Sequence, residues 1–386
     1  GVGAADGRRT RPRPRAAGPG RCAVTALLSA HSVTSLDVVH HADALSLLRG
    51  LRSASVDLIA TDPPYNMRKF PGDTFESDAA LVRWLGVHFA EMRRVLKPNG
   101  SVYVFTWPSL ADLLSVEMRR HFNVLSHVVW RKDQGRHKSA EIEGLRAFFP
   151  QSERIILAEQ RGADSMALGE SQYAAACDEL RGFVFEPLRA YLDDERERAG
   201  ISFEQVRQIV ECAPGSGLPS HWFTRSQWAL PTEDNYLKLR AGFNALGNGS
   251  GEYLRREYED LRREYEDLRR PFNATPDAPY TDVWDFPTVG AYPGRHPTEK
   301  PLAMMRHIVR VSSRPGAVVL DPFCGSGTTL LAAYLEGRQY IGGDFAQRWV
   351  HRSRQRIAEH TRPMQAAAVQ HDDVSDLPLF AAQEAA

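Results

Sequence analysis

The chain has 386 residues, of which 42% are hydrophobic, and its 48 basic side chains equal its 48 acidic side chains in number. At roughly 150 residues per domain, this length predicts one to three domains with room for a buried core. The apolar fraction excludes a wholly disordered chain, and the balanced charge excludes a uniformly basic coat for nucleic acid.

The four cysteines lie far apart, without a CxxC pair. This spacing argues against a disulfide scaffold or a zinc ribbon and fits a reducing compartment. No apolar run approaches the ~20 residues of a membrane span, and the arginine-rich N-terminus lacks the apolar stretch of a secretory signal. We therefore expect a soluble, cytoplasmic protein.

Composition changes along the chain and divides it into five segments. Residues 1–22 are rich in Pro, Gly and Arg and predict a disordered basic tail. Residues 23–159 and 281–360 alternate between strand and helix patterns, as α/β proteins do. Residues 160–280 are polar and mainly helical, which indicates an inserted domain. Residues 361–386 show little periodicity and predict a flexible C-terminal tail.

Short apolar strands alternate with helical patterns in both α/β segments. Strands are predicted at residues 36–40, 56–60, 101–105, 124–130, 154–158, 317–320 and 339–342, and helices at residues 45–51, 79–96, 302–311 and 328–335. Strands that are apolar on both faces and alternate with helices indicate a sheet covered on both sides. The sequence therefore predicts a doubly wound α/β fold with a mostly parallel, seven-stranded sheet.

The inserted segment contains a tandem seven-residue repeat, residues 254–260 and 261–267. Its Leu and Tyr residues are spaced 4-3-4-3 from Leu254 to Leu268, which places them on one face of a predicted helix. We favour packing of this apolar stripe on the insert itself. Contact with nucleic acid or a dimer interface remains an alternative.

The first chemical motif, Asp62-Pro63-Pro64-Tyr65, directly follows the apolar strand predicted at residues 56–60. Ligands of open α/β sheets bind at this edge of the sheet. The Asp62 carboxylate and the Pro63 carbonyl supply two acceptors for the two hydrogens of an exocyclic amino group. The Tyr65 ring offers a flat surface on which a base can stack.

The second motif, residues 321–329 (DPFCGSGTT), lies between a predicted strand and a predicted helix. Its glycines permit a ligand to approach the backbone at a helix N-terminus. The motif is neither a Walker A loop nor a dinucleotide fingerprint, because no Gly-Lys-Ser/Thr and no third glycine follow. Asp344 ends the next predicted strand, where its carboxylate is placed to bind ribose hydroxyls. This pattern is typical of a nucleoside ligand without a pyrophosphate.

The two motifs, in this order, resemble those of the β-class amino DNA methyltransferases, which use S-adenosylmethionine (AdoMet). In that family a catalytic half precedes an AdoMet-binding half, and a target-recognition region lies between them. The resemblance covers about residues 35–158 and 281–359. Further matches are Ala42-Asp43, residues 128–132 (VVWRK) and residues 296–301 (HPTEKP). The resemblance implies a Rossmann-like methyltransferase sheet with permuted motif order.

The resemblance also implies a role for each matching residue. Asp62 and the Pro63 carbonyl would hold the target amino group, with Pro64 fixing the turn, and Tyr65 would stack on a base flipped out of the duplex. Residues 323–327 would cradle the methionine end of AdoMet. The full implied AdoMet set is Asp43, Thr298, Lys300, Asp321, Phe323, Gly325, Ser326, Gly327 and Asp344. No metal is implied, because the methyl group is already activated.

The expected partner is double-stranded DNA, which would make the protein nucleoid-associated. In the family that this sequence resembles, Asp at the first motif position is typical of adenine methylation, so the resemblance implies adenine N6 as the target of Asp62, and cytosine N4 is the alternative. A non-catalytic DNA-binding module on the same fold would require damage in one of the motifs, and neither is damaged. A homodimer and a cognate restriction endonuclease remain open as further partners.

Base reading is expected from the insert. Arg225 and Gln227 lie in an aromatic segment between two predicted helices and, with Lys132, are the candidate DNA-binding residues. Such an arrangement could read a groove as a helix-turn-helix does. The aromatic residues Trp222, Phe223 and Trp228 could equally form the core of this small domain.

Overall fold

A computed structural model describes residues 35–69, 72–133, 142–160, 184–213, 217–225, 228–249, 251–275 and 279–371. The predicted tail at residues 1–22 lies outside these ranges. Helix α11 (Gln347–His371) continues past the boundary predicted at residue 360, and the chain beyond it is outside the described residues. No helix of the described part is both long and apolar enough to cross a bilayer.

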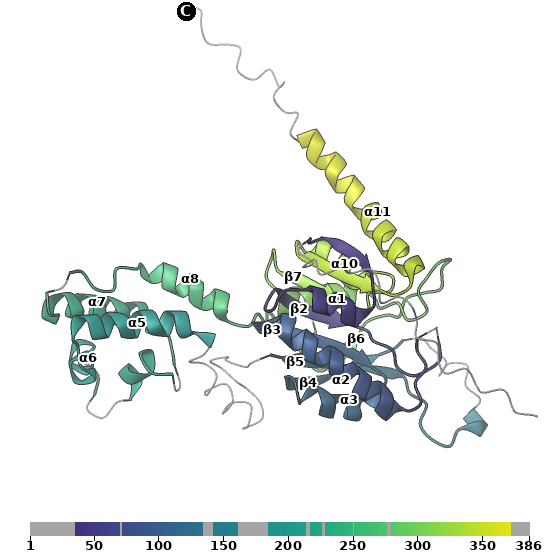
Figure 1. The fold of residues 1–386 in the computed structure, drawn as a ribbon, viewed down its shortest axis with the longest axis horizontal. Helices are drawn as coiled ribbons and strands as arrows, with labels where there is room; N and C mark the ends of the chain where they lie inside the picture. The colour runs from purple at the N-terminus through teal and green to yellow at the C-terminus, as the bar shows by residue number, and fades with distance from the viewer. Residues whose placement is uncertain are drawn as a thin grey trace, which may run out of the picture.

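In the described residues, one sheet of eight strands forms the centre of the larger domain (Figure 1). The strand order is β1-β8-β7-β2-β3-β5-β4-β6. The strands are β1 (Val38–His41), β2 (Val56–Thr61), β3 (Leu96–Thr106), β4 (Asn123–Arg131), β5 (Ser152–Glu159), β6 (Val283–Asp285), β7 (Val318–Asp321) and β8 (Gln339–Asp344). Among the described strands only β5 runs antiparallel to its two neighbours, so the mostly parallel sheet is confirmed. Because β7 pairs with β2 and β8 with β1, segments from both ends of the chain form adjacent strands.

The prediction of seven strands was wrong, since β6 is an eighth. It pairs in parallel with the end of β4, with Trp130 opposite Trp284 and Arg131 opposite Asp285. Trp284 is buried, and Arg131 forms an ion pair with Asp285 at 2.6 Å. A strand of three residues is too short to show alternation in the sequence, so only its partner strand reveals it.

Helices cover both faces of the sheet. Helices α1 (Ala44–Gly50), α2 (Asp78–Val95) and α3 (Ala111–Met118) pack on one face, and α9 (Leu302–Ser312), α10 (Thr328–Leu335) and α11 on the other. Strand β2 is apolar at successive positions because both of its faces are covered. Leu58 and Ala60 face one layer of helices, and Ile59 faces the other. The doubly wound arrangement is therefore confirmed.

The insert is a separate helical unit with its own core (Figure 1). It contains α5 (Glu186–Ala199), α6 (Phe203–Ile209), α7 (Glu233–Leu246) and α8 (Tyr258–Leu268). The predicted repeat helix begins only at Tyr258, because Leu254 has a φ of 50° and lies in non-helical backbone. Leu254 and Leu261 are nevertheless fully buried in the insert core, as the favoured interpretation requires.

The insert is attached to the sheet domain at the edge where β2, β3 and β7 begin. Arg270, just after α8, pairs with the buried Glu159 at the end of the antiparallel β5, at 2.6 Å. Arg314 donates to the Arg269 carbonyl at 2.8 Å, and Asn99 donates to the Asp267 carbonyl at 3.0 Å. The bonds from Arg314 and Asn99 satisfy carbonyl groups at the C-terminal end of α8. Together with the Arg270–Glu159 ion pair, they hold the insert against this edge.

Candidate active site

A cavity of about 490 Å³ opens at the opposite edge, where the parallel strands β2, β7 and β8 end. Tyr65 of the early motif and Ser326 of the late motif both line it. Thr61 at the end of β2 donates to the Asp321 carboxylate at the end of β7, at 2.7 Å. The two motifs, far apart in the sequence, therefore form one site.

In the Asp62-Pro63-Pro64-Tyr65 turn, the Asp62 carboxylate accepts hydrogen bonds from two neighbouring side chains. The Tyr65 hydroxyl donates to Asp62 Oδ1, and the Lys300 ammonium donates to Asp62 Oδ2. Burial raises the pKa of Asp62, and the positive charge of Lys300 opposes this rise. Lys300, which the sequence predicts as an AdoMet contact, lines the same cavity and donates to Asp62.

Glu153 on β5 is a site residue that the sequence did not reveal. Its side chain is 8% exposed, and its Oε2 lies 3.4 Å from both the Lys300 ammonium and the Tyr65 hydroxyl. Lys132 donates to its Oε1. Burial alone would raise the pKa of Glu153, but Lys300 and Lys132 outweigh burial and lower it. Two carboxylates and two ammonium groups thus contact one another behind the turn.

Lys132, which the sequence predicts as a DNA contact, pairs with Glu153 in the structure. Its side chain is 21% exposed, and its ammonium lies 5.0 Å from the centre of the Trp130 ring as well as against Glu153. A lysine held in this way contributes to the charge balance of the cluster. A DNA contact by Lys132 remains an untested prediction.

The loop after the turn is held by Asp73, which the sequence analysis also missed. Its Oδ1 accepts the Tyr65 amide at 2.9 Å, and its Oδ2 accepts the amides of Met67 and Lys69 at 3.2 and 3.1 Å. Asp73 is 1% exposed. These bonds fix a loop in which Asn66 has a φ of 60°, a conformation that needs such support. Tyr65 is thereby fixed through both its backbone and its hydroxyl.

The glycine loop wraps the start of α10. Gly325 and Gly327 have φ values of +49° and +74°, and a Cβ at Gly327 would collide with the Ser353 side chain. Asp321 accepts hydrogen bonds from Thr61, from Thr329 at 2.6 Å and from the Phe323 amide at 3.1 Å. Asp321 therefore shapes the loop from within the protein.

Asp344 and Asp43 line the cavity at its β8 side, as do Phe323, Gly325 and Ser326. Asp344 accepts the Gly325 amide at 3.1 Å and the Ala346 amide at 2.8 Å. Burial raises its pKa, and these two amides oppose the rise. Asp43 caps α1 by accepting the Ser46 amide at 3.0 Å.

The segment before α9 closes another side of the cavity. Thr298 donates through its amide to His296 Nδ1 at 3.3 Å, and His296 packs edge-on against Trp349 with ring centres 4.3 Å apart. Burial and then the charge of Lys300 lower the pKa of His296 to about 4. His296 is therefore neutral at pH 7.

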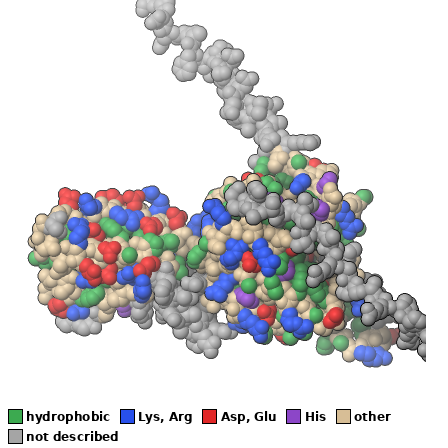
Figure 2. Space-filling model, viewed as in Figure 1, with side chains coloured by type: hydrophobic (Ala, Val, Ile, Leu, Met, Phe, Trp, Pro, Cys, Tyr) green, Lys and Arg blue, Asp and Glu red, His purple; other side chains and the backbone are tan. Residues whose placement is uncertain are grey.

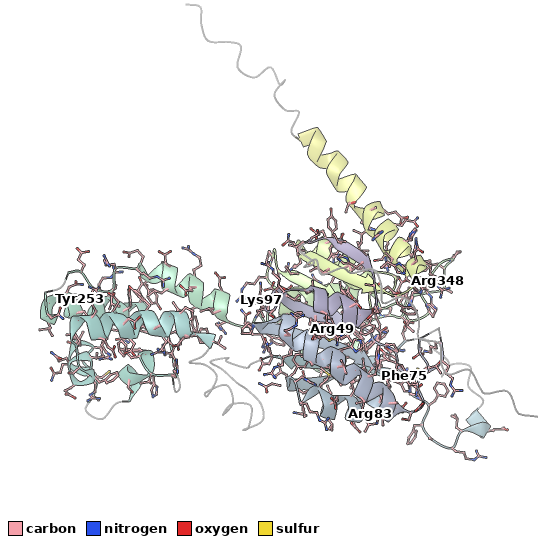
Figure 3. The ribbon with its side chains drawn as sticks, in the orientation of Figure 1. Arg49, Phe75, Arg83, Lys97, Tyr253 and Arg348 are labelled. Atoms are coloured by element: carbon pink, nitrogen blue, oxygen red, sulfur yellow. The ribbon has the colours of Figure 1, made fainter. Side chains whose placement is uncertain are left out.

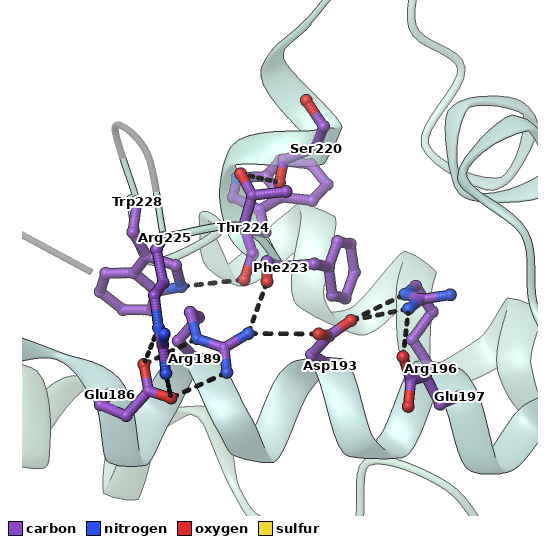
Figure 4. Close-up of polar contacts among 11 residues, drawn as sticks. Glu186, Arg189, Asp193, Arg196, Glu197, Ser220, Phe223, Thr224, Arg225 and Trp228 are labelled. Carbon is purple, nitrogen blue, oxygen red and sulfur yellow. Dashed lines mark hydrogen bonds and ion pairs between the residues drawn. The ribbon is translucent and has the colours of Figure 1, made fainter. Parts of the chain in front are cut away.

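Arg225, a candidate DNA-binding residue of the insert, does not line this cavity. Arg225 forms an ion pair with Glu186 at 3.0 Å (Figure 4). Glu186 also forms an ion pair with Arg189. Gln227 lies outside the described residues. Trp228 donates its indole N–H to the Trp222 carbonyl at 2.9 Å, and the buried aromatic rings form the insert core. Of the two interpretations of these aromatic residues, the core role is confirmed.

These features place the chain among open α/β proteins that bind a ligand where parallel strands end. The chain belongs to the N6/N4 DNA methylase family, whose model matches residues 56–354. This membership confirms the family inferred from the two motifs.

Individual relatives cover different lengths of the chain. The DNA adenine methyltransferase YhdJ of Escherichia coli K12 is 26% identical over 345 residues, 87% of this chain and 88% of YhdJ. The type II methyltransferase M2.MboI of Moraxella bovis is 39% identical over 88 residues, 22% of this chain and 32% of M2.MboI. The PvuII cytosine-N4-specific DNA methyltransferase structure aligns with a TM-score of 0.46 at 13% identity, covering 83% of this chain and 86% of that one.

Proposed function

We propose that this protein transfers a methyl group from AdoMet to the N6 amino group of an adenine flipped out of duplex DNA. The observation that carries the proposal is the cavity shared by the Asp62 turn and the glycine loop. A target amino group at Asp62 and a nucleoside at Asp344 would then occupy one enclosed space. Adenine as the target is supported by Asp62 itself and by the similarity to the adenine methyltransferase YhdJ.

The cavity residues suit a nucleoside-bearing methyl donor. The Asp344 carboxylate can accept from ribose hydroxyls, and the backbone at Gly325 permits close approach because glycine has no side chain. Phe323 and Ser326 line the same wall, and Asp43 lies where an adenine edge could be bound. AdoMet supplies, when bound, a methyl group on a positively charged sulfur.

The residues of the turn act on the amino group. Asp62 and the Pro63 carbonyl accept its two hydrogens, which keeps the nitrogen lone pair available for bond formation. The new N–C bond uses this lone pair, the S–C bond breaks toward sulfur, and the nitrogen then loses one proton. Asp62 is placed to receive that proton, because burial favours its protonated form.

Cytosine N4 is the second candidate target, since the family includes methylases of both amino groups. Incubation with AdoMet carrying a tritiated methyl group and unmethylated plasmid DNA, followed by digestion to nucleosides, separates the two. Label in N6-methyladenine nucleoside supports the proposal. Label in N4-methylcytosine nucleoside would replace it with the second candidate, and label in neither would refute both.

A further inference from the structure

The acceptor that the target amino group needs is already occupied in this structure. Asp62 has two carboxylate oxygens: Oδ1 holds the Tyr65 hydroxyl and Oδ2 holds the Lys300 ammonium. The Lys300 side chain is 7% exposed, so no bulk water surrounds this ion pair. A carboxylate oxygen can accept more than one hydrogen bond, but a base that donates to Oδ2 must share this oxygen with the ammonium until the ammonium moves.

A second acceptor for that ammonium lies next to it. Glu153 Oε2 is 3.4 Å from Lys300 Nζ, at the outer limit of direct contact, and Glu153 is as buried as Lys300 itself. A short movement of Nζ would exchange one carboxylate for the other without exposing either charge. The rings of Tyr65 and Phe105, 5.6 and 5.1 Å from Nζ, flank the ammonium.

We propose that Lys300 is a placeholder for the target amino group, and that Glu153 is the positioning residue that receives its ammonium when a base enters. The inference rests on the proposed function, because it assumes a base at Asp62. It holds for adenine N6 and cytosine N4 alike, since both present two N–H donors. In this arrangement the positive charge of Lys300 stays near Asp62 while the Asp62 oxygen becomes available to the base.

Glu153→Gln tests the exchange because glutamine keeps the shape but loses the charge that attracts Lys300. We expect kcat/KM for plasmid DNA to fall about tenfold, with AdoMet binding by calorimetry unchanged. Glu159→Gln is the matched control, because Glu159 is on the same strand, is buried and pairs with Arg270 at the far edge. It should lower thermal stability but leave kcat/KM within twofold.

The role of Lys300 is isolated by a double-mutant cycle. If Glu153 acts through Lys300, then Glu153→Gln in a Lys300→Met background should change kcat/KM by less than about twofold. An equal loss in both backgrounds would overturn the inference and leave Glu153 with a merely structural role.

A direct readout does not depend on turnover. The sequence has six lysines, so the Lys300 Nζ signal in protein labelled with ¹⁵N-lysine can be assigned by its loss in Lys300→Met. We expect this signal to shift when duplex plasmid fragments bind the wild type, and not to shift in Glu153→Gln. DNA binding without a shift in the wild type would overturn the placeholder alone. A protein that neither binds nor methylates DNA would refute the proposed function, and the placeholder with it.

Discussion

At the scale of single residues, the site depends on how one buried carboxylate is held by its neighbours. Asp62 has two partners that donate to it, and Glu153 balances the charge of Lys300 behind it. Removing one member leaves the others buried without compensation, which costs more than the lost bond itself. The members of the cluster should therefore respond to substitution as a group.

Asp62→Asn should abolish most turnover while sparing the methyl-donor site. Asparagine keeps one acceptor oxygen but loses the negative charge and presents N–H groups to the amino group. We expect kcat to fall about 10²–10³-fold, the range for loss of one preorganised electrostatic contact. AdoMet affinity by calorimetry should change less than about twofold.

The control for this change is Asp57→Asn at the other end of β2. Asp57 binds Lys97 at 2.8 Å and the Val318 amide at 2.9 Å, far from the cavity residues. It should lower the melting temperature without altering kcat. Wild-type turnover in Asp62→Asn would remove Asp62 from the role assigned to it.

At the scale of elements, loops at the strand ends carry the site while the strands only align them. Because β2 and β7 are adjacent and parallel, their last residues necessarily emerge side by side. The conformation of the loop after β2 is set by Asp73 and that of the loop after β7 by Asp321. Buried carboxylates thus bind backbone amides in both loops: Asp73 in the first loop, and Asp321 and Asp344 in the second.

Asp73→Ala should loosen the loop at residues 65–69 without unfolding the sheet. Three amides lose their acceptor, at about 1 kcal/mol each where solvent does not replace it. We expect faster hydrogen exchange at Tyr65, Met67 and Lys69 and a fall in kcat of about tenfold. Asp260→Ala, which removes an exposed ion pair with Arg263 in the insert, is the control. Unchanged exchange in Asp73→Ala would show that the loop is held in another way.

The sequence predicted the strands and the two motifs better than the group of charged side chains around Asp62. The strands from β1 to β5, β7 and β8 have patterns of apolar residues, and both motifs end such strands, so the shared cavity could be expected. Glu153 is one acidic residue within a strand pattern, and its partner Lys300 comes from a distant segment. Leu254 carries the heptad spacing but not helical backbone, because periodicity does not report φ.

At the scale of the whole molecule, the insert and the cavity lie at opposite edges of the sheet. Figure 3 shows Lys97 beside the insert, with Phe75 and Arg348 on the far side of the sheet domain. Arg348 lines the cavity. On the face in Figure 2, acidic and basic side chains intermix over the insert, whereas basic side chains cluster over the sheet domain. This placement does not favour the insert as the first contact of a base that enters the cavity.

The connection between β4 and β5 emerges at the cavity edge instead. Arg131 at the end of β4 pairs with Ser152 at the start of β5, and Arg154 pairs with Thr106 at the end of β3. The described part of this β4–β5 connection contains Phe148, which is fully exposed. The neighbouring Arg146 is exposed and, among its bonds in the described chain, donates to the carbonyls of Glu143 and Leu145. An exposed aromatic ring beside an arginine suits stacking on a base and contact with a phosphate.

DNA contact at the β4–β5 connection and DNA contact at the insert predict opposite effects of two substitutions. If the β4–β5 connection meets the DNA near the flipped base, Phe148→Ala should raise the dissociation constant for duplex plasmid fragments about fivefold or more, since stacking contributes about 1–3 kcal/mol. Arg225→Ala should then change it less than twofold, because the Arg225 guanidinium is paired with Glu186. Fluorescence anisotropy at fixed salt measures both, since phosphate contacts are salt-dependent. The reverse ranking would return DNA recognition to the insert, with the DNA reaching across the sheet domain between the two edges.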